Sequence, residues 1–231
     1  MFIFLDTETT GTGPEDRLCQ IAFKPEGGPA VCETFNPGMP ISIDAMSIHH
    51  ITNRMVQGKP SFRGSETHTK LQNLVAAGKN VIVAHNARFD VDMLNKEGIF
   101  PPRVICTFKL ARYLDKNGVI PTYNLQYLRY FLDLKIEATP HNALGDILVL
   151  EGVFNRINTK FQGISELEDP VEEMIRISNS PILIPRMPFG KHKGKLFGDV
   201  PPDYLEWLLT TELNEDMEFT VKKHLEGVPG E

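Results

Sequence analysis

Short apolar runs separated by turn residues divide the chain into predicted strands. Residues 2–5 (FIFL) and 81–84 (VIVA) are apolar at every position, which is typical of strands buried on both faces. Residues 17–24 and 30–35, on either side of a Gly-Gly-Pro break, predict two further short strands, and 103–106 predicts another. The first three predicted strands follow one another closely, so they are expected to form a meander.

Apolar residues at helical spacing predict the helices, several of which end at a glycine. The predicted helices cover residues 44–50, 52–57, 65–77, 87–97, 108–116, 124–132 and 143–158. The N-terminal part of the chain therefore contains consecutive predicted strands, and the part that follows contains strands that alternate with helices. This order predicts an α/β fold in which a mixed central sheet is flanked by helices.

The pattern changes after about residue 160, where a polar stretch and several prolines interrupt it. We interpret residues 1–160 as one domain, 161–186 as a linker with a helix at 171–178, and 187–231 as a small C-terminal module. The expected apolar core of this module consists of Phe189, Leu196, Phe197, Tyr204, Trp207, Leu208, Leu209, Phe219 and Leu225.

Two carboxylates close the first predicted strand. Because side chains alternate along a strand, Asp6 and Glu8 point to the same face, about 7 Å apart. Neighbouring carboxylates repel each other and stay ionised only with positive charge between them. A divalent cation is the simplest candidate, since Mg²⁺ and Mn²⁺ prefer oxygen ligands. Taken alone, the D-x-E pair is more typical of acidic residues that simply end a strand and begin a turn.

Two further aspartates lie near the start of predicted helices. Asp90 belongs to HNARFD after the 81–84 strand, and Asp146 belongs to HNALGDI. Either carboxylate would also complement a helix dipole without any further role. His141 precedes Asp146 by five residues, and a single histidine at such a position is commonly an ordinary loop residue. The ordered combination of D-x-E, H-N-x-x-F-D and H-x4-D is far more specific than any of its parts.

This combination resembles the DEDDh exonucleases, the DnaQ-like branch of the ribonuclease H-like fold, over about residues 1–156. The AMSIHHIT stretch at residues 45–52 resembles the same family. The resemblance implies a ribonuclease H-like fold and two-metal hydrolysis of a phosphodiester at a free 3′ end. The matching catalytic positions are Asp6, Glu8, Asp90, His141 and Asp146.

The family resemblance also implies a role for each position. Asp6, Glu8, Asp90 and Asp146 would hold two Mg²⁺ or Mn²⁺ ions, and His141 would take a proton from the attacking water. Residues expected to contact the substrate within the family motifs are Thr7, Thr9, Thr10, His49 and Asn86.

Many members place a leucine after the motif glycine, against the last base. This chain has Thr12 there. The departure predicts a preference for single strands or frayed ends over intact duplex ends.

The C-terminal sequence PFGKHKGKLFGDVPPDYLEWLL, at residues 188–209, resembles the small module of the exonuclease X type. Lys191, Lys193 and Lys195 alternate with other residues, so on a hairpin they would form one positive face. Such a face binds phosphates through counterion release. A solvated lysine edge that discourages strand pairing would have the same pattern.

Composition limits the remaining classes. The formal net charge of -6 at first argues against a nucleic-acid partner, but the expected metal ligands contribute to that total. Cys19, Cys32 and Cys106 are odd in number and form no C-x-x-C pair, which argues against disulfides and zinc. We interpret them as small buried residues in a reducing compartment. With no signal-like segment or membrane-length apolar run, the expected location is cytoplasmic.

The leading hypothesis is a stand-alone 3′→5′ DNA exonuclease that releases nucleoside 5′-monophosphates in DNA repair. Its expected partner is DNA with single-stranded or frayed 3′ ends, and a DNA polymerase or repair proteins are candidate protein partners. An epsilon-like proofreading subunit and an RNA-directed 3′→5′ exoribonuclease are the alternatives within the same chemistry. A non-catalytic nucleic-acid-binding protein and a metal phosphatase for small nucleotides come from other classes. The oligomeric state stays open.

Overall fold

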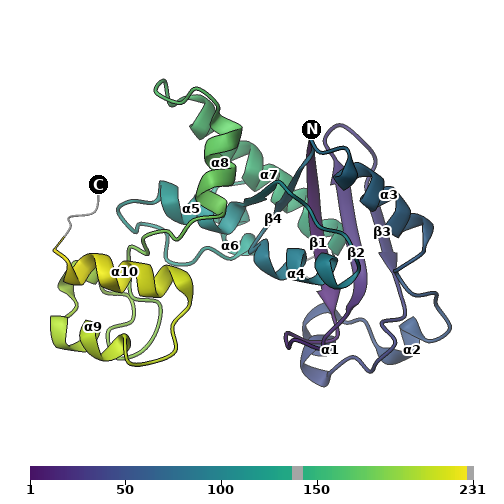
Figure 1. Ribbon diagram of the computed structural model, residues 1–231, viewed down its shortest axis with the longest axis horizontal. Coiled ribbons are helices and arrows are strands. Elements are labelled where there is room, and N and C mark those ends of the chain that lie inside the picture. The colour runs from purple at the N-terminus through teal and green to yellow at the C-terminus, as the bar shows by residue number, and fades with distance from the viewer. Residues whose placement is uncertain (137–142, 228–231) are drawn as a thin grey trace.

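The computed structural model describes residues 1–136 and 143–227 and contains a mixed five-stranded sheet in the order β3-β2-β1-β4-β5 (Figure 1). The strands are β1 (Phe2–Thr9), β2 (Leu18–Pro25), β3 (Val31–Thr34), β4 (Val81–Ala84) and β5 (Val104–Cys106). β1, β2 and β3 pair antiparallel, whereas β4 lies parallel to both β1 and β5. The predicted meander and mixed sheet are confirmed.

The structure contains every helix that the apolar periodicity predicts, with small shifts at the ends, and two further helices in the C-terminal module that were not predicted. They are α1 (Ile43–His49), α2 (Asn53–Val56), α3 (Glu66–Ala76), α4 (Arg88–Lys96), α5 (Thr107–Leu114), α6 (Leu125–Phe131), α7 (Ala143–Gln162), α8 (Pro170–Ser178), α9 (Pro202–Leu208) and α10 (Glu215–Leu225), with a 3₁₀ turn at Phe197–Asp199. α7 runs past the predicted end at residue 158 because Phe161 continues its buried stripe.

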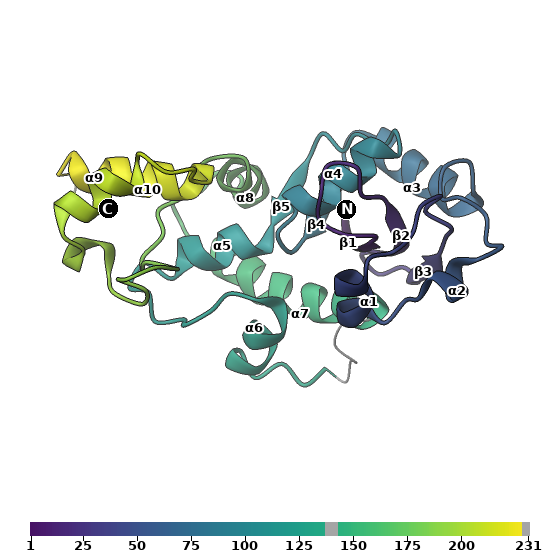
Figure 2. The same cartoon turned by 90° about the horizontal axis from the view of Figure 1, so that it is seen from below.

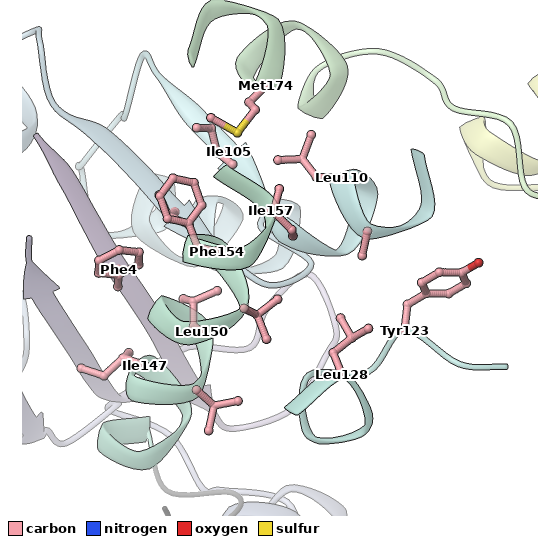
Figure 3. Close-up of a cluster of buried hydrophobic side chains, with 14 of the residues drawn as sticks. Phe4, Ile105, Leu110, Tyr123, Leu128, Ile147, Leu150, Phe154, Ile157 and Met174 are labelled. Atoms are coloured by element: carbon pink, nitrogen blue, oxygen red, sulfur yellow. The ribbon is translucent and has the colours of Figure 1, made fainter. Parts of the chain in front are cut away.

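The alternation of side chains along β1 directs its residues into two separate apolar layers. Phe4 packs in the layer formed with α5, α6, α7 and α8, where Leu150 and Phe154 lie against it (Figure 3). Ile3 and Leu5 point the other way, into the layer formed with α3 and α4. The sheet therefore lies between α3 and α4 on one side and α6 and α7 on the other (Figure 2). By the same alternation, Asp6 and Glu8 share the α7 side.

The segment at 161–186, interpreted above as a linker, is largely packed onto the first domain. Met174 and Ile177 of α8 are buried in the same apolar layer as Phe4. Ser178 Oγ also accepts a hydrogen bond of 2.8 Å from the backbone nitrogen of Cys106 in β5. The predicted helix in this segment is present, and it extends the core of the sheet domain.

The C-terminal module forms a small apolar core of its own beyond α8 (Figure 1). The predicted core was partly wrong, because Phe189, Leu196, Trp207 and Leu209 are between 37% and 53% exposed. Helical spacing explains the exposure of Trp207, since α9 buries Leu205 and Leu208, which lie three positions apart. Phe189 and Leu196 lie outside the helices, in the largely exposed segment before the 3₁₀ turn. The buried residues of this core are Ile184, Met187, Phe197, Val200, Leu205, Leu208, Met217 and Val221.

Two further expectations concern cysteines and membranes. Cys19 and Cys106 are buried as expected, but Cys32 is exposed on the short edge strand β3, so its predicted burial was wrong. Across residues 1–136 and 143–227, no helix is both long enough and apolar enough to span a bilayer.

Candidate active site

Three carboxylates meet near the C-terminal end of β1. Asp6 and Glu8 point toward the α7 side, and Asp146 lies in the first turn of α7. One ligand oxygen from each of the three can be chosen so that all lie within 4.8 Å of one another. Residues 140 positions apart in sequence are therefore brought together because α7 packs along β1.

Asp90 reaches the same region from the other side of the sheet. β4 pairs with β1 only as far as Phe4↔Val83, so β1 continues beyond the end of its neighbour. α4 begins there, and the Thr7 hydroxyl donates a hydrogen bond of 2.7 Å to Asp90 Oδ1. Asp90 is buried, with only 3% of its surface exposed. Its contact with Thr7 holds it beside the strand that carries Asp6 and Glu8.

The electrostatics of the site are those of carboxylates crowded together away from water. Burial and then the charge of Asp90 raise the pKa of Asp6 well above its ordinary value. Burial and then the charge of Asp146 raise the pKa of Glu8 to about 8. Burial also raises the pKa of Asp90 to about 7, although the hydrogen bond from Thr7 opposes the shift. An oxygen-rich cluster that is costly to ionise fits a hard divalent cation, which would stabilise the ionised form.

These pKa shifts predict how metal and pH affect stability. Because the folded carboxyls hold protons that the unfolded chain has released, the metal-free protein should lose stability as pH rises from about 4.5 to about 8. A bound cation should reverse this loss, adding about 2.7 kcal/mol at a hundred times its Kd. Urea unfolding at pH 5 and pH 8.5, with Mn²⁺ or with chelator, measures the effect. Equal stabilisation by Mn²⁺ at both pH values would contradict the prediction.

Gln126 supports Asp146 and was not identified from the sequence. Its Nε2 donates a hydrogen bond of 2.6 Å to Asp146 Oδ1, and its Oε1 accepts one of 3.3 Å from Arg129 Nη1. Arg129 also donates to the Ile136 carbonyl and is buried. α6 packs against α7 and presents Gln126 to the carboxylate. No spacing rule relates residue 126 to residue 146, so only the packing of the two helices reveals this contact.

Replacing Gln126 by methionine should therefore weaken the site without removing a ligand. Loss of an outer hydrogen bond to a metal-binding carboxylate typically costs about 10- to 100-fold in metal affinity or activity. Titration calorimetry with Mn²⁺ and steady-state turnover measure the two effects. Gln162→Met is a suitable control, because Gln162 lies exposed at the far end of α7. Unchanged affinity and turnover in Gln126→Met would show that the contact has no functional weight.

The threonine side chains expected to contact substrate make hydrogen bonds inside the protein in this structure. Thr7 donates to Asp90, and Thr9 Oγ1 donates to the Gly11 carbonyl at 2.7 Å. Thr10 is completely buried and donates to Asp16 Oδ1 at 2.6 Å. In this structure the three hydroxyls therefore fix the strand end and the loop that follows it, and their expected contact with a nucleotide stays a prediction.

His49 has a similar internal position. The ring is 7% exposed, and its Nδ1 accepts a hydrogen bond of 3.0 Å from the Ile51 backbone nitrogen. Its Nε2 therefore carries the proton and donates to the Thr9 carbonyl at 3.1 Å. Burial lowers the pKa of His49, in keeping with this neutral form. In this structure the His49 ring supports the backbone next to Glu8, and its expected contact with substrate stays a prediction.

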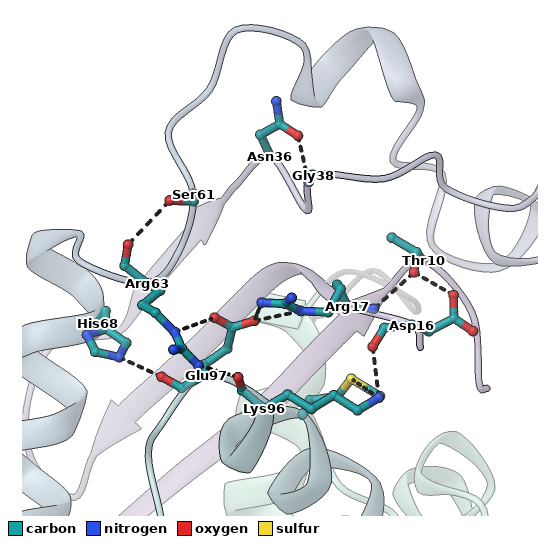
Figure 4. A network of polar contacts seen from close by, with 11 residues as sticks. Thr10, Asp16, Arg17, Asn36, Gly38, Ser61, Arg63, His68, Lys96 and Glu97 are labelled. Atoms are coloured by element: carbon teal, nitrogen blue, oxygen red, sulfur yellow. Dashed lines mark hydrogen bonds and ion pairs between the residues drawn. The ribbon is translucent and has the colours of Figure 1, made fainter. Parts of the chain in front are cut away.

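The loop after β1 is anchored to the end of α4 (Figure 4). Lys96 Nζ donates to the Asp16 carbonyl at 2.8 Å, and Glu97, which is 4% exposed, pairs with Arg17 at 2.6 Å. Arg63 approaches the other oxygen of Glu97 at 3.8 Å. Asp90 lies at the beginning of α4 and this anchor lies at its end. One helix thus fixes both a carboxylate and the loop beside it.

The other predicted site residues, apart from the carboxylates, the threonines and His49, lie in turns and loops or outside the described residues. Asn86 is exposed in the turn between β4 and α4, with a left-handed φ of 63°. Lys191, Lys193 and Lys195 are exposed in the C-terminal module, in turns and a bend rather than on a strand, so the expected strand alternation was wrong. His141 lies outside the described residues.

Comparison with known protein families gives matches to both parts of the chain. An exonuclease family model, of the RNase T type, matches residues 3–154. A second model, described as a putative quorum-sensing-regulated virulence factor, matches residues 180–215. The first match contains Asp6, Glu8, Asp90 and Asp146, and the second contains the three lysines.

Individual relatives are consistent with these matches. Exodeoxyribonuclease 10 of Escherichia coli strain K12 is 33% identical over 201 residues, which is 83% of this chain and 82% of the relative. DNA polymerase III subunit epsilon of Treponema pallidum is 30% identical over 164 residues, 66% of this chain and 74% of the relative.

Two solved structures share the fold. A structure of exonuclease X in complex with 5′ overhanging duplex DNA is 29% identical, with a TM-score of 0.56, and the match covers 77% of this chain and 99% of that one. Escherichia coli exonuclease I in complex with a dT13 oligonucleotide, at 19% identity and a TM-score of 0.58 over 70% of this chain and 41% of that one, matches the ribonuclease H-like fold. Together, the family match, the extent of the relatives and the shared fold show that this chain belongs to the DnaQ-like 3′–5′ exonucleases and resembles their exonuclease X type.

Proposed function

We propose that this protein is a metal-dependent 3′→5′ exonuclease that hydrolyses DNA to nucleoside 5′-monophosphates. The observation that carries the proposal is the convergence of Asp6, Glu8 and Asp146 within 4.8 Å, with Asp90 held by Thr7 against the strand that carries two of them. The similarity to an exodeoxyribonuclease over 83% of the chain supports DNA as the substrate.

The protein's own residues have distinct parts in this mechanism. Asp6, Glu8, Asp90 and Asp146 would hold Mg²⁺ or Mn²⁺, with Thr7 orienting Asp90 and Gln126 orienting Asp146. When bound, two such ions would activate the attacking water and offset charge on the phosphate and on the departing 3′ oxygen. We assign to His141 the removal of a proton from the attacking water, since an unperturbed histidine titrates near neutral pH.

End-labelled strands test polarity, sugar preference and metal requirement together. Single-stranded DNA and RNA of the same sequence, labelled at the 5′ end, are digested with Mg²⁺ and with chelator. The proposal expects a ladder of progressively shortened DNA strands, little shortening of RNA, and no products with chelator. Labelled 5′-monophosphates released from a 3′-end label identify the product. Faster digestion of RNA would overturn the substrate assignment in favour of an exoribonuclease.

We also propose that single-stranded or frayed 3′ ends are preferred. Thr12 stands where many family members have a leucine that packs against the last base. A short polar side chain there offers little apolar surface to separate a terminal base pair. Comparing initial rates on a single strand, a frayed duplex and a blunt duplex of the same sequence measures the preference. Equal rates on all three would contradict it, and Thr12→Leu should raise the rate on the blunt duplex.

A role in DNA repair is favoured over proofreading by the extent of the similarity. The exodeoxyribonuclease match covers 83% of this chain, whereas the epsilon subunit match covers 66%. The C-terminal module has an apolar core of its own, and the proofreading hypothesis does not require such a module. Stable co-purification with a replicative polymerase would favour the alternative, and co-purification with repair proteins would favour the repair role.

A further inference from the structure

The C-terminal module carries its lysines on one compact loop. Lys191, Lys193 and Lys195 are all exposed, and residues 186–198 contain no acidic side chain. The loop is closed by the bridge between Arg186 and Leu196 and by the hydrogen bond from Gly194 to the Met187 carbonyl at 2.8 Å. Three positive charges are therefore held close together by a defined backbone.

A row of rings runs from this loop to an exposed tryptophan on α9. His192 lies between the lysines and is 7% exposed, with its ring centroid 4.6 Å from that of Tyr204. The Tyr204 and Trp207 rings follow at 5.2 Å, and Trp207 is 53% exposed. Gly190 lets the loop lie against Tyr204, because an added Cβ would be 2.5 Å from the tyrosine oxygen. The lysines and the indole thus belong to one continuous surface.

We propose that this surface, formed by Lys191, Lys193, Lys195, Tyr204 and Trp207, binds a single-stranded segment of the nucleic-acid substrate away from the carboxylates. The proposal rests on the proposed exonuclease function and deepens it. Positive side chains next to an exposed aromatic ring are the combination that binds single strands, since phosphates meet the charges and bases stack on the ring.

The distribution of charge selects this occupant and its orientation. α9 carries Asp203 and Glu206 on either side of Tyr204, so the helix itself repels phosphates. The backbone of the strand must therefore follow the lysine loop, which leaves the bases over Trp207. An acidic protein segment would satisfy the lysines equally well, but it would bring no flat ring to stack on the indole. The pairing of lysines with an exposed indole favours a polynucleotide.

Trp207 is the only tryptophan in the chain, so intrinsic fluorescence reports on this surface alone. The full-length protein is titrated with an unlabelled oligo-dT of about 30 nucleotides in EDTA, which prevents metal-dependent cleavage. Quenching of the tryptophan emission is expected, with an affinity that falls as salt increases. Replacing all three loop lysines by glutamine should weaken binding and reduce the log–log salt slope by about 2, since each contact with a single strand contributes about 0.7.

A matched control removes three exposed lysines elsewhere, Lys70, Lys79 and Lys222, so that the net charge changes equally. This control should keep the quenching and most of the salt slope. Absence of quenching in the wild-type protein, or equal losses in the two triple variants, would overturn the proposal. Stronger quenching by a poly-glutamate peptide than by oligo-dT would also overturn it, in favour of an acidic protein partner.

Kinetics separate this surface from the catalytic centre. Trp207→Ala should raise KM on a 30-nucleotide strand by roughly 5- to 150-fold, the range measured when one stacked base loses its aromatic platform. Trp207→Phe should recover part of the loss, and kcat on a dinucleotide should be unchanged in both variants. Unchanged KM on the long strand would count against the proposal. If the protein shows no nuclease activity but quenching persists, the proposed function fails while strand binding stands.

Discussion

Asp6→Asn is expected to reduce turnover by roughly 10³-fold or more and to remove tight Mn²⁺ binding. Asp6 lies in the carboxylate cluster with Glu8 and Asp146, and its pKa is raised by burial and then by the charges of Asp90, Glu8 and Asp146. Metal ions contribute several kcal/mol to catalysis of this kind, and each 1.36 kcal/mol is a factor of ten in rate. Asparagine has almost the same shape as aspartate, so the fold should be kept. Single-turnover digestion and Mn²⁺ calorimetry measure the two losses.

The control for this substitution is Asp92→Asn, an exposed aspartate on the same helix as Asp90. It should retain wild-type turnover and metal affinity. The metal-free Asp6→Asn protein should also be more stable than wild type at pH 8, because one crowded carboxylate has been removed. Wild-type turnover together with undiminished Mn²⁺ affinity in Asp6→Asn would exclude Asp6 from the metal site.

His141→Ala is expected to reduce turnover by about 10²- to 10⁴-fold while metal binding survives. A positioned general base contributes a factor of this size, and the alanine variant removes the proton acceptor without removing a carboxylate ligand. The acid limb of the pH–rate profile, which reports the protonation of an essential base, should disappear in the variant. Turnover from pH 5.5 to 9 and Mn²⁺ calorimetry measure both effects.

His50→Asn is the matched control, since His50 is exposed and its left-handed φ of 62° is one that asparagine tolerates. The control should keep the full pH profile. If His141→Ala retained the wild-type acid limb, another group would have to serve as the base, and the assignment from the sequence motif would be wrong.

The sequence predicted those features that depend on a local pattern of residue types. Fully apolar runs at 2–5 and 81–84 identified the central strands, and strand alternation placed Asp6 and Glu8 on one face. The order of the motifs then indicated that Asp90 and Asp146 belong with them, and the packing of α4 and α7 brings both to β1. These inferences depend on local periodicity and on motif order, both of which are visible without coordinates.

Features that depend on contacts between distant segments were not accessible in the same way. Gln126 meets Asp146 only because two helices pack together, and the hydroxyl of Thr7 points to Asp90 because β4 is shorter than β1. His49 belongs to a family motif, but both of its ring nitrogens form hydrogen bonds with the backbone. The module core was partly misassigned because large apolar residues were counted without regard to the face of α9 that they occupy, or to the largely exposed segment that carries Phe189 and Leu196.

Asp90 and Asp146 reach the site from opposite sides of the sheet, and this arrangement has a consequence during translation. Asp90 arrives with α4 on one side, whereas Asp146 arrives with α7, which ends only at Gln162. Under the proposed mechanism, a nascent chain that has not yet released α7 from the ribosome would lack Asp146, one of the four proposed metal ligands, and would not cleave the nucleic acids that surround it. Exonuclease activity would then arise only after α7 has folded against β1.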